Sequence, residues 1–222
     1  MRFLAAGVSI LCVSVASAGV IVSDFGPGES YSASGGLGIH GAIVLPQGTV
    51  PAVSYAAAFT PTSTVEFGSV VIAALGLDIG SAPDLVVSLD ADSNGTPGSV
   101  LESFSFPPSD FSGSVSEVSE VLTGTSVLNP TLVAGTQYWI QVSSADLNAI
   151  YEWDNNSLSP GQYGVEQYMN GSWSFLSDVL TPAFEVDSLD PTPAPEPAAG
   201  VLLGIGLLAL VLTRTRPAAR KA

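Results

Sequence analysis

Oxygen-bearing side chains alternate in one short segment of the chain, Asp90-Ala91-Asp92-Ser93-Asn94-Gly95. A calcium-binding loop begins in this way, because alternate side chains point inward and the glycine permits a sharp turn. The complete loop needs a glutamate at its twelfth position, where this chain has Leu101 and places Glu102 one residue late. Aspartate, asparagine and glycine are also ordinary turn residues. Two interpretations therefore stand: a polar hairpin connection, or a Ca²⁺ site formed by Asp90, Asp92 and Asn94.

Three tryptophans, Trp139, Trp153 and Trp173, are candidates for carbohydrate contact. An exposed indole offers a flat apolar surface on which a sugar ring can stack. Trp139 alternates with Gln137 and Gln141, which is the pattern of an exposed aromatic residue on the polar face of a strand. The alternative is that the three rings pack between sheets or at sheet edges, where aromatic side chains bury the most surface.

Catalytic residue types are scarce. His40 is the only histidine, and it lies in the glycine-rich stretch 35–41, which predicts a loop. A Ser-His-Asp arrangement would depend on this one residue. Carboxylates are plentiful, but no pair stands out as the acid and base of a glycosidase. The sequence therefore predicts that the chain is not an enzyme, with a glycan-active hydrolase as a distant alternative.

Charge is distributed very unevenly along the chain. The 222 residues include 20 acidic side chains and only five basic ones, which are Arg2, Arg214, Arg216, Arg220 and Lys221. No lysine or arginine occurs between Gly19 and Pro195. Within this segment no carboxylate can pair with a lysine or arginine, and the field of these carboxylates repels nucleic acid. We therefore expect no nucleic-acid partner.

The first 18 residues have the layout of a secretory signal. One positive charge at Arg2 precedes an apolar stretch, and small residues follow at Ala16-Ser17-Ala18. This order predicts cleavage after Ala18, with Ala16 and Ala18 as the recognised positions. Cys12 would be removed with the signal, so the mature domain would have no disulfide bond and would depend on its core for stability.

The last 32 residues divide into three parts. Residues 191–197 form a proline-rich linker that stays extended and exposed, because proline lacks a backbone donor and fixes φ. Residues 198–213 are an uncharged run that would span about 24 Å as a helix. Residues 214–222 contain four of the five basic side chains, which marks a cytoplasmic end. These parts predict one C-terminal transmembrane helix that anchors residues 19–190 outside the cytoplasm at the inner membrane.

The order of these parts resembles the PEP-CTERM sorting tail, with Pro195-Glu196-Pro197 at the position of its signature. The resemblance covers residues 194–222 and implies a bacterial host with an exopolysaccharide envelope. It also implies a partner, the membrane transpeptidase or protease called exosortase, and release or transfer of the domain to the cell surface.

Residues 19–190 are predicted to form one acidic domain of the all-β class. Leu85, Val87 and Leu89 share one strand face, and Tyr138, Ile140 and Val142 share another. Residues 165–169 and 172–176 flank Asn170-Gly171, a pair that suits a two-residue hairpin turn. Further strands are expected at 21–25, 53–59, 65–77, 100–106, 115–122, 150–154 and 183–187. Many short strands with hairpin turns favour an antiparallel two-sheet sandwich of jelly-roll type.

Four fragments of this domain resemble the choice-of-anchor R domain, a β-rich extracellular module joined to different anchoring tails. They are residues 56–62, 87–104 and 128–144, and the final hairpin with Trp173. The resemblance brings no catalytic role. The sequence as a whole predicts an exported surface protein with a structural or adhesive role in the exopolysaccharide envelope. A carbohydrate- or calcium-binding module is the alternative.

Overall fold

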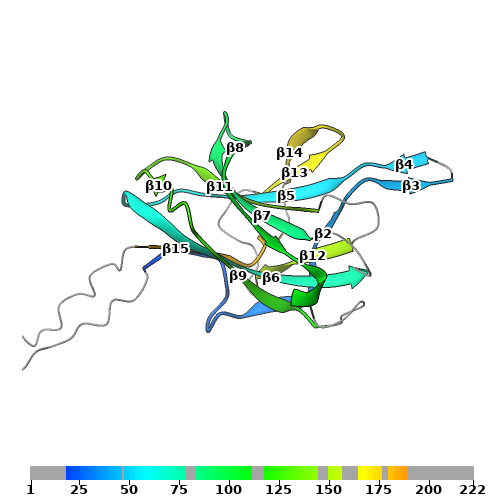
Figure 1. Ribbon diagram of the computed structural model, residues 1–222, viewed down its shortest axis with the longest axis horizontal. Helices are drawn as coiled ribbons and strands as arrows, with labels where there is room; N and C mark the ends of the chain where they lie inside the picture. The colour runs from blue at the N-terminus through cyan, green and yellow to red at the C-terminus, as the bar shows by residue number, and fades with distance from the viewer. Residues whose placement is uncertain are drawn as a thin grey trace, which may run out of the picture. The chain divides into compact units, whose positions relative to one another are not determined.

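Antiparallel strands build the part of the chain that the computed structural model describes. This part comprises residues 19–46, 48–78, 84–111, 118–144, 150–156, 165–176 and 180–189, within one compact unit that runs from Ala18 to Asp190. A short 3₁₀ helix, η1 (Pro108–Asp110), lies among the strands. The strands are β1 (Val20–Ser23), β2 (Tyr31–His40), β3 (Ile43–Leu45), β4 (Gly48–Val50), β5 (Val53–Phe59), β6 (Val65–Asp78), β7 (Leu85–Asp92), β8 (Pro97–Phe106), β9 (Glu120–Thr125), β10 (Thr131–Leu132), β11 (Tyr138–Ser144), β12 (Ile150–Asn156), β13 (Val165–Met169), β14 (Ser172–Leu176) and β15 (Phe184–Ser188) (Figure 1).

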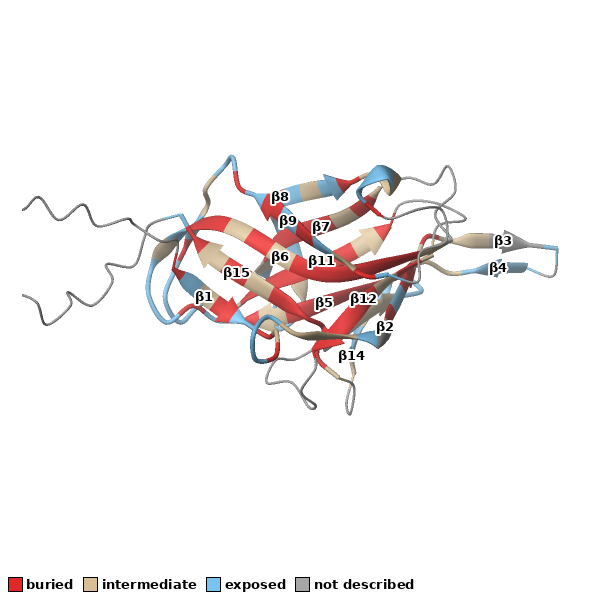
Figure 2. Cartoon of the chain, turned by 90° about the horizontal axis from the view of Figure 1, so that it is seen from below, coloured by how far each residue is buried: buried red, intermediate tan, exposed pale blue. Residues whose placement is uncertain are grey.

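Hydrogen bonds connect 13 of these strands in the order β1-β15-β6-β12-β2-β5-β11-β7-β8, with β9 and β10 added on β6 and the β13–β14 hairpin added on β5. The arrangement is all-β, antiparallel and sandwich-like. We call β1, β15, β6, β9, β12 and β2 the first sheet, and β14, β13, β5, β11, β7 and β8 the second sheet. Within the described residues, β2 pairs with β5 only at His40 and Val53. The β3–β4 ribbon forms a separate small sheet beside them (Figure 2).

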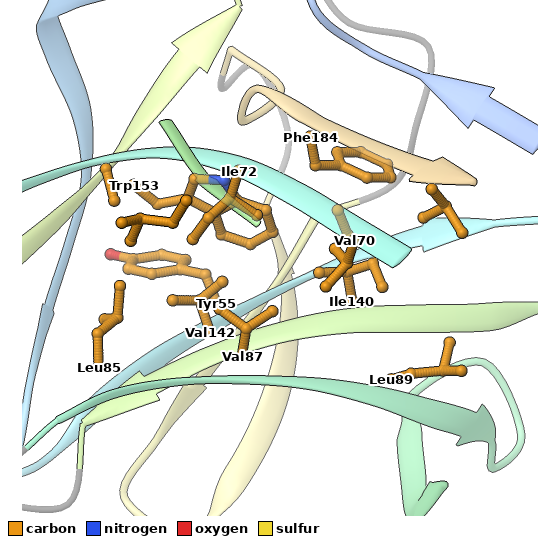
Figure 3. Close-up of a cluster of buried hydrophobic side chains, with 14 of the residues drawn as sticks. Tyr55, Val70, Ile72, Leu85, Val87, Leu89, Ile140, Val142, Trp153 and Phe184 are labelled. Carbon is orange, nitrogen blue, oxygen red and sulfur yellow. The ribbon is translucent and has the colours of Figure 1, made fainter. Parts of the chain in front are cut away.

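The core lies between the two sheets, and strand alternation fills it. Leu85, Val87 and Leu89 on β7 are each 0% exposed, and Tyr138, Ile140 and Val142 on β11 are also buried, so both predicted faces are confirmed. Val70 and Ile72 of β6 pack into the same core from the first sheet (Figure 3). These side chains supply the burial that holds a fold without disulfide bonds.

Two Asn-Gly pairs close two of the hairpins. Asn170 and Gly171 have φ values of 56° and 84°, as the predicted two-residue turn requires, and β13 and β14 have the predicted bounds. Asn94 and Gly95 have φ values of 57° and 86° and connect β7 to β8. Asparagine and glycine tolerate this left-handed conformation better than other residues do.

The prediction of a loop at residues 35–41 is wrong, because β2 extends from Tyr31 to His40. One of its glycines, Gly36, has a packing reason that periodicity does not show. A Cβ atom on Gly36 would lie 2.4 Å from the carbonyl oxygen of Trp153 on the neighbouring strand β12. The strand expected at 115–122 is observed only from Glu120 onward, and residues 112–117 lie outside the described part.

No helix among the described residues is long and apolar enough to cross a membrane. The predicted transmembrane run, 198–213, lies outside these residues, as do the signal residues Ala16 and Ala18 and the motif Pro195-Glu196-Pro197.

Candidate functional site

Asp92, at the end of β7, organises a polar cluster on the outer face of the second sheet. Its Oδ1 atom accepts hydrogen bonds from Trp139 Nε1 and from Gln137 Nε2, both at 2.9 Å. The backbone N–H of Gly95 donates to the same carboxylate at 3.2 Å. The bond from Trp139 is the main reason why the pKa of Asp92 lies below its usual range. The cluster therefore holds a charged carboxylate beside an indole ring at neutral pH.

Asp90 lies two residues earlier on the same outer face, and it is 1% exposed. Burial raises the pKa of this carboxyl to about 6, and the neighbouring Ser88 offsets part of the rise. Among the described residues, no donor lies in hydrogen-bonding geometry to either oxygen of Asp90. Asp90 also pairs with Trp139 across the β7–β11 ladder. A buried acid, an exposed acid and an indole are thus adjacent.

The three predicted calcium ligands have different surroundings. Asp90 is buried, Asp92 accepts three donors, and Asn94 occupies the hairpin turn. The turn is closed by a hydrogen bond of 2.8 Å from the N–H of Ser93 to the carbonyl of Thr96. In the part of the chain that the structure describes, no three His, Cys, Asp or Glu side chains form a metal-binding group. Calcium binding by this segment stays a prediction.

The three predicted glycan-contacting tryptophans are not brought together. Trp153 is 0% exposed in the core, where its Nε1 donates to the carbonyl of Ala183 at 3.0 Å (Figure 3). Its ring also packs edge-on against Phe184, with 6.3 Å between the ring centroids. Trp153 is therefore wrong as a glycan contact, because no ligand can stack on a ring enclosed between two sheets. Trp139 is 3% exposed, which also corrects its expected exposure.

Trp173 belongs instead to an aromatic patch on the β13–β14 hairpin, which we define as Tyr168, Trp173 and Phe175. Tyr168 and Trp173 are cross-strand partners whose ring centroids lie 5.2 Å apart, and Phe175 is 65% exposed. The opposite face of the hairpin turns inward, because Leu176 packs against the core and Gln167 Nε2 donates to Tyr55 Oη at 2.9 Å. Sequence reasoning missed Phe175, although its alternation with Trp173 along the strand is the signal that reveals it.

Two further buried carboxyls lie at the first sheet. Burial raises the pKa of Asp154 to about 6, with Ser119 offsetting part of the rise and Glu152 adding to it. Burial likewise raises the pKa of Asp24 to about 6, although hydrogen bonds from the side chains of Asn156 and Thr181 lower it in part. With no lysine or arginine in residues 19–190, these groups lack the usual partner of a buried acid.

His40 ends β2, and its Nδ1 atom lies 2.8 Å from the carbonyl oxygen of Gly41. This contact places the proton on Nδ1, since a carbonyl only accepts. In the described residues, no serine hydroxyl or carboxylate is bonded to this ring, so the geometry forms no nucleophile–base pair there.

The sequence was compared with protein-family models and with curated proteins. The chain matches none of them.

Proposed function

We propose that this chain is an exported bacterial surface protein, sorted through its C-terminal tail, whose domain has a structural or adhesive role in an exopolysaccharide envelope. In this proposal residues 1–18 are a cleaved signal and residues 198–213 are a temporary membrane anchor. The domain 19–190 takes the jelly-roll form of the sandwich, and the role is not enzymatic.

One observation carries the proposal, namely the order of parts at the C-terminus. Pro195-Glu196-Pro197 is followed by an uncharged run and then by Arg214, Arg216, Arg220 and Lys221. An extended proline-rich segment is accessible to a processing enzyme, and the basic cluster holds the end of the chain on the cytoplasmic side. The all-β domain supports the proposal, because its core accounts for stability outside the cytoplasm without cysteine.

Mass spectrometry of the intact mature protein from cells that produce it tests this function. We expect a mass that lacks residues 1–18 and everything after about Glu196. Glu196→Gln should block the second cleavage, whereas Glu185→Gln removes an equal charge from the folded domain and should leave processing unchanged. A basic tail retained on the wild-type protein would contradict sorting and leave an ordinary membrane anchor.

A carbohydrate-binding role is the second candidate, and the aromatic patch is the observation that favours it. An exposed Phe175 beside the Tyr168–Trp173 pair offers apolar surface for a sugar ring. A panel of labelled polysaccharides, with and without Ca²⁺, should bind the wild-type protein and lose affinity with the double substitution Trp173→Ala and Phe175→Ala. Val127→Ala removes an exposed apolar side chain elsewhere and serves as the control.

The panel also separates the remaining alternatives. Binding that requires Ca²⁺ and is lost in Asp92→Asn would assign calcium to the β7–β8 hairpin. Turnover of any polysaccharide would indicate a glycan-active hydrolase and overturn the non-enzymatic proposal.

A further inference from the structure

A small hollow opens on the outer face of the first sheet, away from the aromatic patch. Its volume is about 250 Å³, and its lining comes from β6, β9, β15 and the segment that follows β1. The lining residues are Phe25, Glu29, Val71, Val121, Thr123 and Glu185. We call it the acidic hollow, because two carboxylates share it with an aromatic ring, two valines and one hydroxyl.

The carboxylates at the acidic hollow have no lysine or arginine partner among residues 19–190. Burial raises the pKa of Glu185, a hydrogen bond from Ser23 opposes this, and the nearby charges of Asp187 and Glu29 raise it further. Asp187 is itself held by Ser69, whose Oγ donates to its Oδ2 at 2.9 Å. No lysine or arginine occurs in residues 19–190 to balance this charge. Within residues 19–190, therefore, no lysine or arginine can supply the cation for this hollow.

A closed turn fixes two of the lining residues. Gly26 and Ser30 exchange backbone hydrogen bonds of 2.7 and 3.2 Å, and Glu29 within this turn has a φ of 59°. Phe25 precedes the turn and packs edge-on against Tyr31, with 6.3 Å between the ring centroids. The Phe25 ring and the backbone of Glu29 are therefore in place before a ligand arrives, which reduces the ordering cost of binding.

The residues at the acidic hollow favour an ammonium group over a metal ion. Calcium takes six to eight oxygen ligands, and the described residues contain no cluster of three metal-binding side chains. An ammonium group needs only a few acceptors, and Glu29 and Glu185 can supply them from two sides. Phe25 adds a ring face that attracts a cation, while Val71 and Val121 suit an apolar surface. Thr123 can bond a hydroxyl group.

We infer that the acidic hollow binds an amino-sugar unit of a glycan, with its protonated amine between Glu29 and Glu185 and its ring against Phe25 and Val121. The volume lies just below the range of about 300–1,000 Å³ for drug-sized ligands, which suits a single sugar unit. The inference rests on the proposed function, since a role in an exopolysaccharide envelope is what makes a glycan the occupant.

The test compares two trisaccharides that share the same sugar backbone and differ at the nitrogen, which is either a protonated amine or a neutral N-acetyl group. The full chain in mild detergent is titrated calorimetrically with a glucosamine trisaccharide and with its fully N-acetylated form, at about 0.15 M salt to screen general attraction. We expect the amine form to bind at least about tenfold more tightly than the acetylated form. Equal binding of the two, or no binding of either, would overturn the inference.

Matched variants locate the site. The double substitution Glu29→Gln and Glu185→Gln should weaken binding of the amine form by about tenfold or more. Glu66→Gln with Asp110→Asn removes the same charge from two exposed positions outside the hollow and should change affinity less than about twofold. An equal loss in both double variants would show attraction to net charge alone and would reject the site.

A second variant keeps the test valid if the double substitution Glu29→Gln and Glu185→Gln unfolds the protein. Val121→Lys places an ammonium group of the chain itself in the hollow and should abolish binding. Val127→Lys adds the same charge at an exposed position elsewhere and serves as the control.

A titration with a short lysine peptide tests for a different ligand. Binding of the peptide but not of the trisaccharide would indicate a protein partner in place of the glycan. Cleavage after about Glu196 is measured separately, so loss of amine binding would overturn this inference and leave the sorting proposal standing.

Discussion

The carboxylate of Glu102 on β8 accepts a hydrogen bond of 2.7 Å from the backbone N–H of Val127, 25 residues later in the chain. Leu128 N–H adds a second bond at 3.1 Å, and the hydroxyl of Ser126 adds a third. Glu102 is 5% exposed, so this acid is buried and fully engaged. Glu102, which comes one residue too late in the sequence for a calcium loop, instead holds the loop between β9 and β10 in place.

Removal of this carboxylate should destabilise the domain strongly. Glu102→Ala leaves two backbone donors and one hydroxyl without their acceptor, and we expect a loss of about 2–4 kcal/mol in the free energy of unfolding. Urea denaturation measures it. Glu66→Ala, at an exposed position, should change stability by less than about 0.5 kcal/mol. Similar effects of the two substitutions would contradict the role of Glu102.

The buried aspartates should make the protein more stable in mild acid than at neutral pH. Burial raises the pKa values of Asp24, Asp90 and Asp154 from 3.8 to about 6. Between these pH values the folded state binds more protons than the unfolded state, so stability falls as pH rises from about 4 to 6 and then levels off. Thermal unfolding between pH 4 and 8 measures this dependence. A melting temperature that rises steadily over this range would contradict it.

One substitution measures how much a single buried acid contributes to the pH dependence of stability. Asp154→Asn removes the charge from a carboxyl that is 0% exposed, and we expect it to raise stability at pH 7 by on the order of 1–2 kcal/mol. The same variant should show a shallower pH dependence than the wild type. Asp110→Asn, at an exposed position, provides the control and should alter neither quantity appreciably.

Two strand glycines should respond differently to a methyl group. On Gly68, a Cβ atom would lie 2.6 Å from the backbone nitrogen of Leu189, and backbone cannot move aside as a side chain can. Gly68→Ala should therefore destabilise the domain by about 1–3 kcal/mol. Gly38 has open space around its Cβ position, so Gly38→Ala should be neutral or slightly stabilising. Urea denaturation of both variants distinguishes these outcomes.

The indole of Trp139 should report on Asp92. Asp92→Ala removes the acceptor of the Trp139 Nε1 hydrogen bond, and we expect the ring to become more accessible to acrylamide quenching of its fluorescence. Stability should fall by about 1 kcal/mol, because the lost bonds are partly exposed. A double substitution, Trp153→Phe and Trp173→Phe, assigns the signal to Trp139. Unchanged quenching would indicate that the ring is held by packing alone.

Much of the fold could be predicted from the sequence, because period-two alternation and Asn-Gly turns act locally. Strand β5 and both arms of the β13–β14 hairpin have the predicted bounds, and the inward faces of β7 and β11 are confirmed. Strand β2 could not be predicted, since its glycines are typical of a loop, and the packing reason for Gly36 is the close approach of Trp153 on another strand.

The candidate sites were less predictable, because they also depend on contacts between residues that lie far apart in the sequence. The sequence does not distinguish the surroundings of the three tryptophans. In the structure, Trp139 lies beside the polar cluster of Asp92, Trp153 lies inside the core, and Trp173 lies on the surface of the β13–β14 hairpin. The acidic hollow combines Glu29 with Glu185, which lie at opposite ends of the domain's sequence. Pairing of β1 with β15 brings these two ends together, and no local pattern encodes that pairing.

The lack of cationic side chains in the strands also governs how the protein can be detected. Trypsin cuts only after lysine or arginine, and none lies between Arg2 and Arg214. A tryptic digest would therefore leave the whole sandwich as one oversized peptide that routine peptide sequencing does not register. A glutamate-specific protease or chymotrypsin has many sites in this stretch, so proteomic surveys that use those enzymes should detect the chain where tryptic surveys do not.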